Sequence, residues 1–117
     1  MLAGALAGLI GVAFGAFGAH GLRGRLSPEM LAVFETGVRY QMYHALALML
    51  TGVMMSRGIV AGRAIAAAGW LFVAGIVLFS GSLYLLAVTG ITVLGAITPI
   101  GGVAFLLGWA CLAIATL

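Results

Sequence analysis

Residues 64–88 read AIAAAGWLFVAGIVLFSGSLYLLAV and contain no charged residue. A helix needs roughly 20 apolar residues to cross the hydrocarbon core of a bilayer, so this run predicts a membrane-spanning helix. Two further uncharged runs cover residues 2–20 and 92–115. The runs are continuously apolar, whereas the strands of an outer-membrane barrel alternate in polarity, so helices are favoured over a barrel.

The composition of the whole chain agrees with this interpretation. Of the 117 residues, 65% are hydrophobic and 6% are charged. A soluble domain carries about 25% charged residues, and a chain this short cannot bury so many apolar side chains away from water. A soluble globular enzyme and a disordered chain are both excluded. With Cys111 as its one cysteine, the chain can form no internal disulfide.

A fourth helix is predicted between the apolar runs at residues 2–20 and 64–88. Ser27, Pro28 and Glu29 form a helix start, with Ser as N-cap, Pro in the first turn and Glu near the positive end of the helix dipole. The next helix-breaking pair is Arg57 and Gly58. The helix so bounded has about 30 residues and is roughly 45 Å long, which exceeds a bilayer core of about 30 Å.

These segments predict an all-α integral membrane protein with a single transmembrane domain over residues 1–117. Short connections make sequential helices antiparallel neighbours. We therefore expect a four-transmembrane-helix antiparallel bundle with an overlong second helix. Its helices cover about residues 2–20, 27–56, 64–88 and 92–115.

Pro99 falls inside the last of these runs. A proline within a helix removes one backbone hydrogen bond and leaves the carbonyl of Gly95 without its usual partner. In lipid that carbonyl must find another donor, and Thr98 is the nearest candidate. The sequence therefore predicts a kink in the last helix.

Glycines recur along the first helix at spacings of four, three, four and three residues, and they fall within about 60° of one another on a helical wheel. They are Gly4, Gly8, Gly11, Gly15 and Gly18. Such a stripe lets two helix backbones approach closely in lipid. It predicts either an interface between subunits of a homo-oligomer or larger membrane complex, or helix packing within one chain.

Polar side chains gather in one half of the predicted bilayer. Antiparallel threading brings the end of the first helix, the start of the second, the end of the third and the start of the fourth to the same side. The predicted polar cluster consists of His20, Glu35, Arg39, Tyr40, Gln41, Tyr43, His44, Ser80, Ser82, Tyr84 and Thr98.

Two interpretations of this cluster remain open. It lines a pocket for a small ligand, ion or proton, with His44 as the titrating group, or it ties the helices together. Glu35 precedes Arg39 by four residues, the favourable order for an ion pair. Trp70 and Trp109 are expected to anchor the helices at the membrane interface.

The sequence offers no catalytic residues and no metal or cofactor site. Met42 and His44 are two residues apart, so they point about 200° apart and cannot readily chelate one ion. No nucleophile–base pair or phosphate-binding glycine loop is present, and the net charge of +3 indicates contact with lipid headgroups rather than with nucleic acid.

Four stretches together resemble a known family. They are GAFGAHGL at 15–22, LSPEMLAVFETGVRYQMYHALAL at 26–48, GWLFVAGIVLFSGSLYLLAVTG at 69–90 and GAITPIGG at 95–102. The chain resembles the small integral membrane proteins called domain of unknown function 423, found in bacteria with relatives in animals. The resemblance implies a compact protein of about four helices in a bacterial cell membrane, and no established activity.

We therefore expect a multi-pass membrane protein that is not an enzyme and whose surroundings are the lipid bilayer. The first hypothesis is a polar intramembrane pocket for a small ligand, ion or proton. The second is a structural or accessory subunit that packs through the glycine stripe. The third is an oligomeric channel or transporter.

Overall fold

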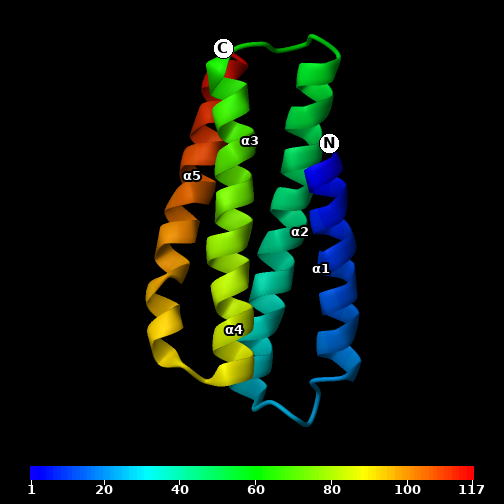
Figure 1. Cartoon of the computed structure of the whole chain (residues 1–117), viewed down its shortest axis with the longest axis vertical. Helices are drawn as coiled ribbons and strands as arrows, with labels where there is room; N and C mark the ends of the chain where they lie inside the picture. Colours follow the sequence, from blue (N-terminus) through cyan, green and yellow to red (C-terminus); the bar gives the residue numbers. More distant parts are fainter.

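The computed structural model describes residues 1–117, and its secondary structure is entirely helical (Figure 1). The elements, in chain order, are α1 (Leu2–His20), α2 (Pro28–Ser56), α3 (Arg63–Gly75), η1 (Ile76–Ser80), α4 (Gly81–Thr89), η2 (Thr92–Ala96) and α5 (Thr98–Ala115). The π-helical segment η1 joins α3 to α4, so these three elements form one rod.

Three helical stretches are long and apolar enough to cross a membrane: α1, the α3–α4 rod and η2–α5. Helix α2 is the longest single helix, with 29 residues, but does not belong to that set. Its first half carries Glu29, Glu35 and Arg39, which lower its apolar character.

The start of α2 follows the sequence prediction. The Ser27 Oγ accepts a hydrogen bond from the backbone N–H of Met30 at 3.1 Å, and Pro28 and Glu29 lie in the first turn. The hydroxyl satisfies one of the free N–H groups at the helix end. Ser27 is therefore the N-cap of α2, as its sequence predicts.

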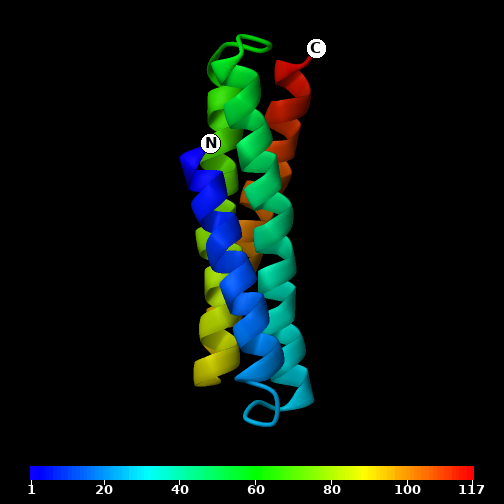
Figure 2. The ribbon, with the colours of Figure 1, turned by 90° about the vertical axis from the view of Figure 1, so that its right-hand side faces the viewer.

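The four rods form a staggered layer rather than a closed bundle. The molecule measures 48 × 26 × 16 Å along its principal axes. Helices α2 and α3 lie in the middle of the layer, α1 packs against α2, and α5 packs against α3 (Figure 1). Turned by 90°, α1 and the α3–α4 rod lie toward one face, and α2 and α5 toward the other (Figure 2).

The glycine stripe of α1 packs against α2 of the same chain. A side chain at Gly4 would meet Met49 and the carbonyl of Ala45, and one at Gly11 would meet Met42. Gly15 and Gly18 lie against Val38 and Phe34 of α2 in the same way, whereas Gly8 has no neighbour within 4 Å. The stripe therefore brings α1 onto α2, and the interpretation as packing within one chain describes these contacts.

Helix α5 approaches the α3–η1 segment through glycines on both sides. A side chain at Gly101 would collide with the backbone nitrogen of Phe79. Phe105 covers Gly75, and Phe72 covers Gly108. The hydrophobic core lies around this contact and consists of Ala47, Leu48, Ile65, Ala68, Phe72, Phe105 and Leu112.

The π-helical segment shifts the buried face of the rod by one residue. Buried residues are Ile65, Ala68, Phe72 and Gly75 before it, Ser80 at its end, and Ser82, Leu83 and Ala87 after it. The step from Gly75 to Ser80 is longer than the three- or four-residue steps that precede it, as i→i+5 hydrogen bonding requires. Ser80 therefore faces α2, and Phe79 turns toward α5.

The last run changes helix type just before Pro99, so the proline does not interrupt a continuous α-helix. The run begins as the 3-10 turn η2, and α5 starts only at Thr98. Pro99 thus lies in the first turn of α5, where the missing N–H has no helical partner to lose.

The close approach at Gly101 gives a matched test of this architecture. Gly101→Ala should lower the free energy of unfolding in detergent by about 1–3 kcal/mol, because the added carbon overlaps the backbone of Phe79. Gly102→Ala is the control, since its added carbon lies 3.8 Å from the Phe79 ring, an ordinary contact. Equal stability of the two variants would contradict the packing described here.

Candidate functional site

The structure divides the predicted polar cluster into three groups. Gln41, His44, Ser80 and Ser82 are buried, and Tyr84 and Thr98 are half-buried. The exposed members are His20, Glu35, Arg39, Tyr40 and Tyr43. The buried members bind one another, the backbone or residues of other helices. Of the exposed residues of α2, Tyr40 still packs against Phe79 of η1.

Gln41 joins three helices. Its Nε2 donates to the carbonyl of Ala7 on α1 at 2.8 Å, and its Oε1 accepts from the hydroxyl of Tyr84 on α4 at 2.7 Å. The side chain is 3% exposed, so it cannot exchange these partners for solvent. Gln41 therefore links both α1 and α4 to α2.

Two serines of the rod make the other contacts in this half of the layer. The Ser80 Oγ donates to the carbonyl of Gly37 at 2.7 Å, where α2 has no side chain to keep the rod away. The hydroxyls of Ser82 and Thr98 are 2.7 Å apart and join α4 to α5. The Thr98 hydroxyl thus pairs with a residue of another helix, and not with the carbonyl of Gly95 as the sequence predicts.

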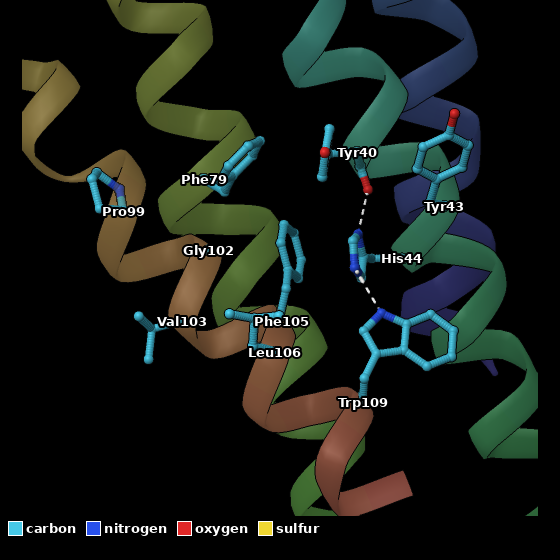
Figure 3. A pocket seen from close by; sticks show the side chains of 10 residues that line it. All are labelled: Tyr40, Tyr43, His44, Phe79, Pro99, Gly102, Val103, Phe105, Leu106 and Trp109. Carbon is cyan, nitrogen blue, oxygen red and sulfur yellow. Dashed lines mark hydrogen bonds between the residues drawn. The ribbon is translucent and has the colours of Figure 1, made fainter. Parts of the chain in front are cut away.

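His44 lies between α2 and α5 with both ring nitrogens in use (Figure 3). Its Nδ1 is 2.7 Å from the carbonyl of Tyr40, and its Nε2 is 3.1 Å from the indole Nε1 of Trp109. A carbonyl only accepts and an indole N–H only donates, so the partners require Nδ1 to carry the proton and Nε2 to be free. The ring also stacks on Phe105, with centroids 3.5 Å apart and planes 9° apart.

Trp109, which the sequence predicts as an interfacial anchor, donates its indole N–H to His44. The expected contact between the two charged side chains of α2 is wrong. Glu35 and Arg39 form no ion pair, and both side chains are exposed. Helical spacing places this glutamate and arginine on one row, but it does not by itself bring their charged groups into contact.

No buried side-chain nitrogen or oxygen lacks a hydrogen-bond partner. No group of three or more His, Cys, Asp or Glu side chains lies close enough to hold a metal ion. The contacts of Gln41, His44, Ser80 and Ser82 thus account for the buried polar groups of the cluster as links between helices.

A groove opens over η1 between α2 and α5, with a volume of about 640 Å³ (Figure 3). We call it the lateral groove. Its lining residues are Tyr40, Tyr43, His44, Phe79, Pro99, Gly102, Val103, Phe105, Leu106 and Trp109. Because α2 and α5 lie toward one face of the layer and the rod toward the other, the groove follows from the stagger of the helices (Figure 2).

A family model described as "Protein of unknown function (DUF423)" matches residues 14–102. The chain belongs to this family. This confirms the resemblance seen in the sequence.

Bacterial relatives match almost end to end. A UPF0382 membrane protein of Staphylococcus aureus is 52% identical over 116 residues, which cover 99% of this chain and 93% of the relative. The UPF0382 membrane protein YwdK of Bacillus subtilis is 50% identical over 115 residues, which cover 98% and 93%. No solved structure matches the chain. Together with its three helices able to cross a bilayer, these relatives make the chain a membrane protein.

The DUF423 chain offers a direct test of the Gln41 link. Gln41→Leu should lower the free energy of unfolding by about 1–3 kcal/mol, because it leaves the Tyr84 hydroxyl without its partner. Adding Tyr84→Phe should recover part of that loss, since no orphaned hydroxyl remains. Reversible unfolding in detergent measures both variants, and purely additive losses would show that the two side chains are not coupled.

A second prediction concerns which ring nitrogen of His44 carries the proton. Solid-state ¹⁵N NMR of the protein in bilayers should show a protonated Nδ1 and an unprotonated, hydrogen-bonded Nε2. Trp109→Phe should shift the Nε2 resonance and leave Nδ1 in place, because only the indole donor is removed. A proton on Nε2 in the unmodified protein would refute this geometry.

Proposed function

We propose that the chain crosses the membrane four times and, rather than catalysing a reaction, binds one hydrocarbon chain of a membrane lipid in the lateral groove. The observation that carries this proposal is the groove itself, an aromatic and aliphatic hollow in which the nitrogens of His44 and Trp109 are already hydrogen-bonded. Volumes of about 300–1,000 Å³ are typical of ligand pockets, and the groove, at about 640 Å³, falls in that range.

The fourth crossing is supported by the position and length of α2. Its 29 residues extend about 43 Å, and the helix runs antiparallel to α1 and α3 along the layer (Figure 1). Its most polar central residues, Gln41 and His44, are 3% and 5% exposed. Polar side chains that face the protein interior oppose insertion of a helix into the bilayer less than lipid-facing ones do. The lower hydropathy of α2 is therefore compatible with a membrane span.

An apolar occupant is favoured over an ion or a proton. The Nε2 of His44 accepts from Trp109 and its Nδ1 faces the carbonyl of Tyr40, so the imidazole offers no free lone pair to a ligand. Phe79, Val103, Phe105 and Leu106 present hydrocarbon around it. Burial of apolar surface against such walls stabilises an acyl chain through van der Waals packing.

The absence of catalysis is supported by the partners of the buried hydroxyls. Ser80 donates to a backbone carbonyl, and Ser82 pairs with Thr98. A catalytic serine needs an adjacent base to activate it, and neither hydroxyl contacts one.

Filling the groove tests the proposal. Gly102→Leu places a branched side chain in the groove, where the glycine has only ordinary contacts with Phe79. In vesicles containing a phospholipid with a photoreactive group in mid-chain, cross-linking to Phe79 should fall relative to cross-linking to the lipid-facing Leu9 of α1. Mass spectrometry of the labelled peptides gives this ratio.

Gly8→Leu is the matched control, because nothing lies within 4 Å of that glycine. It should leave the Phe79-to-Leu9 labelling ratio of the unmodified protein almost unchanged. Equal ratios in the unmodified protein and in Gly102→Leu would remove the lipid-chain proposal.

A further inference from the structure

Arg39 lies on α2, one helical turn from Tyr43 of the lateral groove. It precedes Tyr43, a lining residue, by four positions, so the two share a row on the surface of α2. The side chain is exposed, and no carboxylate pairs with it. Glu35 continues the same row, while Glu29, Arg23, Arg25 and His20 lie near the same end of the layer.

The depth of Arg39 makes a free cation there costly. Counted from Ser56 at the far end of α2, Arg39 is about 25 Å along the helix, near the opposite edge of a hydrocarbon core of about 30 Å. A cation at such a level is stabilised by an anion or by reaching the headgroup layer. Since Glu35 does not pair with it, the nearest plentiful anions are lipid phosphates.

Two phenol groups beside the groove also lack partners. Tyr40 and Tyr43 are 39% and 55% exposed, and neither hydroxyl makes a hydrogen bond in the structure. The Tyr43 ring projects from α2 beside the groove, near His44 (Figure 3). A phenol O–H donates readily to a phosphate oxygen, and a guanidinium binds phosphate with two parallel N–H donors.

We propose that Arg39, with the Tyr43 hydroxyl, binds the headgroup phosphate of an anionic phospholipid. This inference rests on the proposed function, because one acyl chain of that lipid occupies the lateral groove. An anionic lipid fits better than a zwitterionic one, since the ammonium group of a zwitterionic headgroup would place a second positive charge near Arg39.

Competition between two lipids tests the headgroup assignment. The protein is reconstituted in nanodiscs with equal phosphatidylglycerol and phosphatidylcholine, and native mass spectrometry measures which lipid stays bound. The unmodified protein should retain phosphatidylglycerol about fivefold over phosphatidylcholine, the ratio that about one arginine contact near the surface supports. Arg39→Gln should abolish the preference, and Arg39→Lys should keep part of it.

Arg25→Gln is the matched control, because it removes the same charge from an exposed loop at the same end of the layer. It should leave the preference intact. An equal loss in Arg25→Gln and Arg39→Gln would reduce the effect to general surface charge and overturn the site, as would an Arg39→Gln protein that keeps the preference.

The failure of this inference is distinguishable from failure of the lipid-chain proposal. If only the headgroup assignment is wrong, Phe79 is still labelled by the photoreactive chain and Gly102→Leu still lowers that labelling. If the groove binds no chain, the Phe79-to-Leu9 ratio is insensitive to Gly102→Leu whatever the headgroup preference.

Discussion

A buried polar group in a membrane protein must find its partner within the protein, because hydrocarbon offers none. Gln41 satisfies this constraint by joining α1, α2 and α4 through one amide. Ser80 satisfies it by donating to the backbone carbonyl of Gly37, which is accessible because glycine has no side chain. With the Ser82–Thr98 and Trp109–His44 bonds, the buried polar groups link all four rods. These bonds fix which residues of adjacent helices lie level with one another, a register that apolar packing alone specifies weakly.

Glycine determines how closely the rods can approach where these bonds form. Gly4 and Gly11 bring α1 onto α2, and Gly101 brings α5 onto the backbone of η1. Each contact is between neighbours in the layer, so α1 and α5 remain on its two flanks (Figure 1). The staggered layer and the lateral groove are therefore consequences of the same short-range packing.

The sequence predicts positions along the helices better than directions around them. Ser27, Pro28 and Glu29 define a helix start by local chemistry, and the N-cap bond to Met30 is a contact within one turn. The partner of Trp109 lies 65 positions away, and no local pattern specifies it. The π-helical segment is equally hidden, because its shift of Ser80 toward α2 depends on packing between rods.

The predicted polar cluster fails as a single pocket for the same reason. Counting residues predicts similar depths for Arg39 and Gln41, but the Arg39 side chain is exposed and the Gln41 side chain is buried, so the two point to different sides of α2. Both polar atoms of Gln41 are used in hydrogen bonds to neighbouring helices, whereas Arg39 faces outward and its N–H donors have no partner in the protein. Because the buried groups are already bonded, any selectivity for a ligand in the proposed groove has to come from exposed groups near it. Tyr43 lines the groove, and Arg39 is exposed one helical turn before Tyr43. The polar residues of α2 therefore fall into two sets. The buried ones form hydrogen bonds that hold the helices together, and the exposed ones keep donors that are free to bind a ligand.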